Sequence, residues 1–288
     1  METFLFCNPV SGNYQAAAVS CIAKSLHGAG LNPRLCSLFP CEQADEAFRS
    51  IHRATETPLV IVAAGDGTLN AVVNRLEPGR VSLAVLPLGT SNVLAAELGI
   101  TSLDDGVARI IAGQTRALTV GVMENERETR RFVLMAGFGF DGAVVRDVSL
   151  FWKKVIKQGA YGVSALTNSL VWHREGGELL ADGRTVACHS VVICNAARYG
   201  GRFVLAREAS LFSTELVAVC IRNNSRRTYL RLAADLACGE IDRNPDLLIL
   251  PLSECEIRGR LPAQLDGDFA GYSPARISAL PGFARLVV

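Results

Sequence analysis

The sequence predicts an α/β protein of two domains. An N-terminal nucleotide-binding domain has a three-layer parallel sheet, and a C-terminal domain is a mostly antiparallel β-sandwich. Up to Gly121, strand-length apolar runs alternate with helix-like segments, as in parallel sheets covered on both faces. After Gly121, apolar runs follow one another with turn signals between them. The length of 288 residues suits two ordinary domains, which we place at residues 1–121 and 122–288.

The first domain alternates between strands and helices. The run LVIVA at residues 59–63 is apolar throughout, which is typical of a central strand buried on both faces. The pattern predicts strands at residues 3–7, 34–38, 59–63 and 82–86, and helices at residues 15–26, 42–52, 69–76 and 91–98. Ligands of such sheets bind at the carboxyl ends of the strands.

The second domain is richer in strands. Turn signals at Asp182-Gly183, Asn223-Asn224 and Pro281-Gly282 separate several of them. Strands are expected at residues 132–135, 186–194, 216–221, 247–250, 254–257, 275–280 and 284–288, and helices near residues 153–173 and 226–238.

Charge and cysteine content exclude several classes of protein. Lys and Arg total 29 and Asp and Glu total 28, so the net charge of +1 gives no reason to expect a nucleic-acid partner. The nine cysteines include no CxxC pair, and we expect reduced, mostly buried thiols in a cytoplasmic protein. The N-terminus lacks the basic region of a signal peptide, and no apolar run is long enough to span a bilayer.

Three polar loops follow strands of the first domain. They are Asn8-Pro9-Val10-Ser11-Gly12, Gly65-Asp66-Gly67-Thr68-Leu69-Asn70 and Gly89-Thr90-Ser91-Asn92. Each can present backbone N–H groups at a helix N-terminus, which suits anionic oxygens. A helix cap after a tight turn explains any one loop alone, but three loops in one sheet favour a phosphate site. The sequence contains neither a P-loop nor the GxGxxG fingerprint.

Carboxylates accompany these loops and recur in the second domain. Asp66 is the only carboxylate in the three loops, and its chemistry suits Mg²⁺ binding or proton acceptance. Asp141 lies in an apolar stretch. Either it is an ordinary turn aspartate, or its carboxylate has a polar partner or a functional role. Asp266-Gly267 is a hairpin signal, so a turn accounts for Asp266. Asp268 lies just beyond the turn, and its presence is less well explained by the hairpin.

Together these motifs resemble the diacylglycerol kinase catalytic-domain family, the bacterial lipid kinases related to sphingosine and ceramide kinases. The resemblance covers nearly the whole chain. Ala64 replaces the first glycine of the family's Gly-Gly-Asp-Gly-Thr, and Asp268 replaces the glutamate of its Asp-Gly-Glu. The matching segments are residues 8–12, 64–68, 87–92, 139–141, 195–201 and 266–268.

The resemblance implies ATP-dependent phosphoryl transfer to a hydroxyl of diacylglycerol, ceramide or a sphingoid base, in a cleft between the two domains. It implies that Asp268 accepts the proton, that Asp66 orients Mg²⁺-bound ATP and that Asp141 meets the substrate head group or belongs to the catalytic network. Exchange of the first two roles is the alternative. By the same resemblance ATP is held by Asn8, Pro9, Ser11, Gly12, Gly65, Asp66, Gly67, Thr68, Asn70, Gly89, Thr90, Ser91 and Asn92.

Two departures from the family pattern affect these expectations. Asp268 is one methylene shorter than glutamate, which is about 1.5 Å less reach. Residues 212–215, Phe-Ser-Thr-Glu, stand where many bacterial members carry an Asp-Asp-Gly that holds a structural Mg²⁺. The resemblance therefore implies only the Mg²⁺ that ATP brings.

A lipid kinase must meet a bilayer, so we expect transient contact with the inner face of the membrane. Residues 151–157 combine two aromatic rings with three lysines, and a second basic cluster comprises Arg222, Arg226, Arg227 and Arg231. An ordinary solvated helix face explains either cluster as well. An exposed edge strand in the second domain is compatible with a homodimer.

The alternative functions are an NAD kinase-like enzyme, because that family also uses Gly-Gly-Asp-Gly-Thr, and a catalytically weak nucleotide- or lipid-binding regulator.

Overall fold

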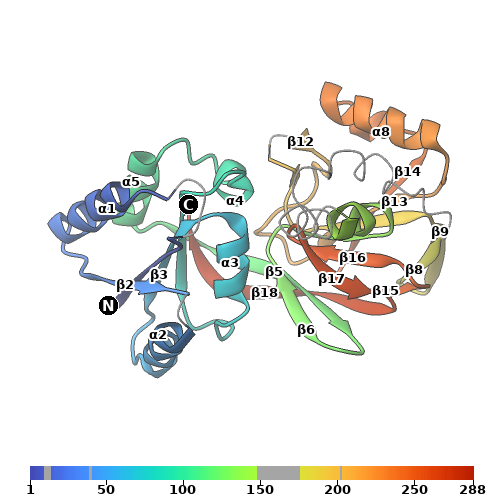
Figure 1. Cartoon of the computed structure of the whole chain (residues 1–288). Helices are drawn as coiled ribbons and strands as arrows, with labels where there is room; N and C mark the ends of the chain where they lie inside the picture. The colour runs from blue at the N-terminus through green and yellow to red at the C-terminus, as the bar shows by residue number, and fades with distance from the viewer. Residues whose placement is uncertain (10–13, 39–40, 148–175, 202) are drawn as a thin grey trace, which may run out of the picture.

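The computed structural model describes residues 1–9, 14–38, 41–147, 176–201 and 203–288. Ser11, Gly12, the basic segment 151–157 and the helix expected near 153–173 lie outside the described residues. Figure 1 shows two domains side by side, joined by the long strands β5 (Thr115–Asn125) and β18 (Ala275–Val287).

The first domain has the predicted three layers. Its parallel strands lie in the order β2-β1-β3-β4. Phe4 and Phe6 point to one face, against α2 and α3, and Leu5 points to the other face, against α1 and α5. The strands are β1 (Thr3–Cys7), β2 (Pro33–Ser37), β3 (Leu59–Ala64) and β4 (Ser82–Pro87), and the helices are α1 (Ala16–Gly28), α2 (Cys41–Arg53), α3 (Asp66–Val73), α4 (Val93–Glu97) and α5 (Leu103–Ala112).

The second domain is the predicted antiparallel sandwich. One sheet has the order β14-β13-β10-β7-β16-β17, and it packs on the part of the first sheet formed by β18, β15, β8 and β9 with β5 and β6. Phe132, Phe138, Ile193 and Ile277 fill the space between the two layers. The strands not yet given are β6 (Thr129–Phe132), β7 (Met135–Phe138), β8 (Gly177–Ala181), β9 (Arg184–Cys188), β10 (Ser190–Cys194), β13 (Leu216–Ile221), β14 (Leu247–Leu252), β15 (Glu254–Arg258), β16 (Pro262–Leu265) and β17 (Asp268–Tyr272).

Smaller elements complete this domain. The helix expected at residues 226–238 is α8 (Arg226–Cys238), and a 3₁₀ turn, Ile241–Arg243, follows it. A short ribbon of β11 (Arg198–Tyr199) and β12 (Phe203–Val204) contacts α4 through β11 and α8 through β12. Residues 140–147 are helical. No helix within the described ranges has the length and apolarity needed to cross a bilayer. The eight cysteines whose side chains are described are free thiols, and five of them are buried.

Three expected elements differ from the observed ones, and in the first two of them tertiary contacts override the local pattern. The apolar run 186–194 is two strands in different sheets, broken where the His189 N–H donates to the Ile221 carbonyl. Residues 133 and 134 leave the expected strand 132–135, because their N–H groups donate to Asp266. Helix α3 begins at Asp66, three residues before its expected start.

Strand β18 is the largest difference from the sequence prediction. Residues 275–280 and 284–288 were expected to be separate strands joined at Pro281-Gly282. They form one strand with a register shift between Leu280 and Ala284, where Gly282 has a φ of 68°. The first part of β18 pairs with β15 in the second domain, and its end pairs with β4 in the first. The expected division at 121–122 falls inside its partner strand β5.

Candidate active site between the two domains

Two glycine loops meet at the carboxyl ends of β3 and β4. A Cβ atom on Gly89 would lie 2.3 Å from the Cα of Gly65, closer than real atoms approach. Position 89 therefore needs glycine for the loops to lie in contact, and a Cβ on Gly65 would lie at a tight 3.2 Å from the Cα of Gly89. A Cβ on Gly67 would meet nothing within 4 Å, so its backbone is open to the cleft. This pair of loops fits a ligand that approaches main-chain N–H groups closely, as phosphate does.

Asp66 joins the two loops. Its carboxylate accepts hydrogen bonds from the backbone N–H groups of Val93 (3.0 Å) and Leu94 (3.2 Å), the first residues of α4. Asn92, just before them, has a left-handed φ of 47°, and its side-chain amide binds both the N–H and the carbonyl of Gly89. Both carboxylate oxygens of Asp66 are thus engaged with the backbone of the neighbouring loop.

The loop after β1 contacts α3, the helix that carries Asp66. The side-chain amide of Asn8 donates to the hydroxyl of Thr68 on α3 at 3.0 Å. Pro9, Thr90 and Ser91 are exposed, and the last two border the cleft. All of the predicted nucleotide-binding residues that the structure describes therefore lie in or beside three adjoining loops.

Asp266 connects the two domains. It occupies the predicted hairpin turn, with a φ of 48° followed by Gly267 at 91°. Its carboxylate accepts hydrogen bonds from three consecutive N–H groups, of residues 133–135, and from the Asn70 amide at 2.6 Å. Burial raises the pKa of Asp266, and these four donors partly offset that rise. Asn70, predicted to bind the nucleotide, directs its amide across the domain boundary.

Asp141 lies at the centre of a buried polar group. It accepts hydrogen bonds from the Tyr199 hydroxyl and from the Gln264 amide, the latter at 2.6 Å. Burial raises the pKa of Asp141, and the hydrogen bonds from Tyr199 and Gln264 only partly offset the desolvation of its carboxylate. Sequence reasoning missed Tyr199 and Gln264. Tyr199 lies within the matching segment 195–201 and Gln264 lies just before the segment 266–268, but an isolated Tyr or Gln carries no signal of its own.

One cavity of about 440 Å³ brings these groups together. The glycine loops line one side of it, and the second domain lines the other. Asp268 borders the cavity, is exposed, and makes no side-chain hydrogen bond within the described residues. The polar lining residues are Asp66, Thr90, Ser91, Asp141, Tyr199, Gln264, Asp266 and Asp268. Among the residues with described coordinates, no three His, Cys, Asp or Glu side chains are placed to hold a metal ion.

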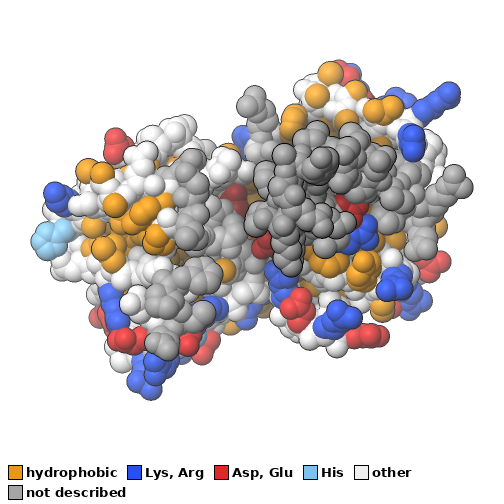
Figure 2. Space-filling model, viewed as in Figure 1, with side chains coloured by type: hydrophobic (Ala, Val, Ile, Leu, Met, Phe, Trp, Pro, Cys, Tyr) orange, Lys and Arg blue, Asp and Glu red, His pale blue; other side chains and the backbone are white. Residues whose placement is uncertain are grey.

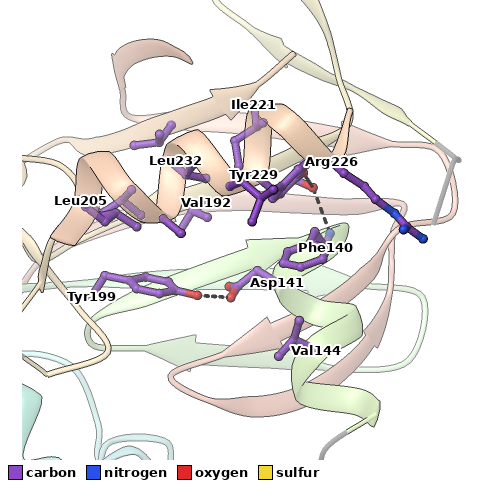
Figure 3. A pocket seen from close by; sticks show the side chains of 15 residues that line it. Phe140, Asp141, Val144, Val192, Tyr199, Leu205, Ile221, Arg226, Tyr229 and Leu232 are labelled. Atoms are coloured by element: carbon purple, nitrogen blue, oxygen red, sulfur yellow. Dashed lines mark hydrogen bonds between the residues drawn. The ribbon is translucent and has the colours of Figure 1, made fainter. Parts of the chain in front are cut away.

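A second cavity of about 630 Å³ opens from the same point into the sandwich domain. It lies between α8 and the sheet of β10 and β13, and most of its lining is apolar (Figure 3). Asp141 and Tyr199 line both cavities, so one carboxylate stands where the polar cleft meets the apolar pocket. The apolar lining is Phe140, Val144, Val192, Leu205, Val219, Ile221, Leu230, Leu232, Ala233 and Leu236.

Comparison with known proteins agrees with this geometry. Residues 2–123 match the family model of the diacylglycerol kinase catalytic domain, and residues 135–288 match that of the YegS C-terminal NAD kinase β-sandwich-like domain. The diacylglycerol kinase of Bacillus subtilis is 26% identical over 76% of this chain and 74% of its own. A probable YegS-like lipid kinase of Pseudomonas aeruginosa is 30% identical over 79% and 75%.

The fold has a counterpart among solved structures. The crystal structure of a putative diacylglycerol kinase from Bacillus anthracis superposes with a TM-score of 0.78, over 99% of this chain and 94% of that one, at 18% identity. The comparisons confirm the predicted fold class and the predicted enzyme class, a kinase with an alcohol group as acceptor. The chain therefore belongs to the diacylglycerol kinase catalytic-domain family, with a C-terminal sandwich of the YegS type.

Proposed function

We propose that the protein transfers the γ-phosphate of ATP to the hydroxyl of an uncharged or cationic lipid, such as diacylglycerol, ceramide or a sphingoid base. One observation carries the proposal: Asp141 and Tyr199 line both the polar cleft and the apolar cavity. A lipid with its chain in the apolar cavity presents its hydroxyl beside Asp141, at the edge of the glycine loops. A cavity of about 630 Å³ is within the range of ligand pockets.

The charge at this junction favours particular acceptors. Asp141 and Asp268 are both carboxylates, and Arg226, at the rim, is the one basic side chain among the described residues that line the apolar cavity. A phosphate-bearing head group would meet like charge there. We therefore expect neutral glycerolipids and ceramides, or an amine-bearing sphingoid base, to be better acceptors than phosphatidylglycerol.

Different residues of the cleft bind the nucleotide, accept the proton and position the loops. The loops at Asn8, Gly65–Thr68 and Gly89–Asn92 hold the nucleotide, and Mg²⁺-bound ATP supplies the phosphoryl group and neutralises its charge. Asp268 takes the proton of the lipid hydroxyl, because its carboxylate is free of described partners. Asp66, held by two N–H groups of α4, keeps the two glycine loops together.

A transfer assay tests this function. The protein is incubated with γ-labelled ATP, Mg²⁺ and a lipid panel that includes diacylglycerol, ceramide, a sphingoid base and phosphatidylglycerol, with NAD as a further acceptor. Asp66→Ala runs in parallel. Label in a neutral or amine-bearing lipid that disappears in Asp66→Ala supports the proposal. Label in NAD alone would support the NAD kinase alternative, and a thermal shift with ATP but no labelled product would support the regulator.

A further inference from the structure

Helix α8 has an unusual outer face. Ser225 caps its start, with the side chain accepting from the Thr228 N–H, and Gly239 ends it with a left-handed φ of 71°. Its inner face lines the apolar cavity. The residues spaced three and four apart on its outer face are all exposed, namely Arg227, Leu230, Arg231, Ala234 and Cys238.

Leu230 stands out within this face. At 72% it has the largest exposed fraction of any large hydrophobic side chain in the described parts of the chain. Figure 2 shows hydrophobic side chains over α8 with basic side chains at one end of it. A single exposed leucine is common in soluble proteins, but one flanked by arginines on an amphipathic helix is typical of surfaces that insert into a lipid interface.

The charge on α8 is unbalanced. It carries three arginines, at positions 226, 227 and 231, and one carboxylate, Asp235. Asp235 accepts a hydrogen bond from the Asn244 amide at 2.7 Å and lies 3.8 Å from Arg231. Arg226 and Arg227 form no ion pair with any residue whose position is described. The helix therefore presents positive charge that suits an anionic surface.

The position of α8 links this surface to the pocket. Arg226, Leu230 and Ala233 line the apolar cavity, yet all three are exposed, so they stand at its rim. Tyr229, on the inner side of the first turn, fixes the helix to the sheet. Its hydroxyl lies 2.6 Å from both the Ser190 hydroxyl and the His189 ring. The exposed face and the rim of the pocket are consequently parts of one rigidly held helix.

We propose that the outer face of α8 docks the protein on an anionic lipid bilayer, with Leu230 in the interface and the arginines on lipid phosphates. In this position the rim of the apolar cavity lies against the bilayer that supplies the acceptor, a consequence that rests on the proposed function. Docking itself does not depend on turnover. The expected site on the membrane is the anionic inner leaflet.

Vesicle sedimentation tests the docking. The probes are vesicles of phosphatidylcholine alone and vesicles containing one third phosphatidylglycerol. Arg227→Gln/Arg231→Gln is compared with Arg49→Gln/Arg53→Gln, a matched pair of exposed arginines on α2 of the other domain. We expect wild type and the α2 pair to sediment with the anionic vesicles, and the α8 pair to bind them about tenfold more weakly.

Two further variants test the apolar part of the contact. Ala234→Glu places a carboxylate at the centre of the outer face and should weaken binding without touching the cavity. Leu230→Ser should weaken it too, whereas Ile111→Ser, an exposed aliphatic residue on α5, should not. Undiminished binding of both the arginine pair and Ala234→Glu would overturn the proposal.

A kinase assay separates failure of the docking from failure of the function. With a short-chain diacylglycerol dissolved as monomer, Arg227→Gln/Arg231→Gln should match wild type, because neither arginine lines the cavity. With acceptor in anionic vesicles the same variant should be about tenfold slower. Equal loss on both acceptors would assign these arginines to catalysis and contradict docking. Absence of turnover on every lipid would refute the proposed function and leave the sedimentation result to decide the docking.

Discussion

The side-chain amide of Gln264 donates a hydrogen bond to Asp141 at 2.6 Å, and its carbonyl accepts one from the Gly267 N–H at 2.7 Å. Gln264 is 2% exposed. One side chain thus connects the carboxylate at the junction of the two cavities to the turn that precedes Asp268. Neither connection requires a charge, so the network holds Asp141 in place without neutralising it.

Gln264→Met should make the stability of the protein fall more steeply with pH. Burial raises the pKa of Asp141 in the folded protein, so its contribution to stability is largest below its unfolded pKa, about 3.9, and is lost as pH rises through the folded value. Removing the Gln264 donor raises the folded pKa further. Urea unfolding between pH 4 and 8 should show the variant losing more stability than wild type, by about 1.4 kcal/mol per unit of added pKa shift.

The control for this prediction removes the titrating group. In the Asp141→Asn background, Gln264→Met should change stability equally at all pH values. A pH dependence of Gln264→Met that is identical to that of wild type would show that the amide does not act on the Asp141 carboxylate.

Asp268→Asn should lower kcat by about 10²- to 10⁴-fold with an unchanged melting temperature, because the amide has no basic oxygen to accept the hydroxyl proton. The measurement is steady-state kinetics on the best acceptor of the panel. Asp182→Asn, another exposed carboxylate of the sandwich domain, serves as the control and should keep full activity. Full activity of purified Asp268→Asn would assign the base role elsewhere, with Asp66 the alternative.

Asp266→Ala should destabilise the protein far more than Asp182→Ala. Both aspartates begin Asp-Gly hairpin turns, with φ values of 48° and 50°, so both variants lose the same turn preference. Only Asp266 also accepts hydrogen bonds from three N–H groups and Asn70. Leaving these donors unsatisfied should cost on the order of 3 kcal/mol more in urea unfolding. Equal losses would mean that the carboxylate contacts contribute little.

Gly89→Ala should raise the KM for ATP by about 10²-fold, because its Cβ would force the two glycine loops apart. Gly28→Ala provides the comparison: it lies at the end of α1, and its added Cβ meets nothing within 4 Å. Kinetics at saturating lipid, over a range of ATP concentrations, measure the effect. A KM for Gly89→Ala within a factor of two of wild type would argue against the glycine loops as the nucleotide site.

Much of the first domain could be predicted because each unit of strand, loop and helix is local in sequence. The apolar run at residues 59–63 and the polar loop after it lie within one short segment, so both strand and loop were found. Asp66 and Asn92 were predicted to belong to one site for the same reason, since the ends of parallel strands meet at one edge of the sheet.

Contacts between distant segments could not be predicted. Asp266 reads as an ordinary hairpin aspartate, and its contact with Asn70 becomes visible only when the two domains are in place. Tyr199 and Gln264 likewise gain a role only through Asp141. The single strand β18 was missed because Pro281-Gly282 is a turn signal locally, whereas long pairing with β5 carries the chain through it.

Strand β18 also has a consequence for the order of folding. The edge of β4 in the first domain is covered by Arg285 and Leu286, which the ribosome adds long after β4 itself. Until then β4 presents unpaired backbone groups, which are a template for pairing with other chains. Residues 1–123 alone should therefore form an incomplete sheet that self-associates, and the nucleotide domain should reach its final state only together with the sandwich, in one cooperative step.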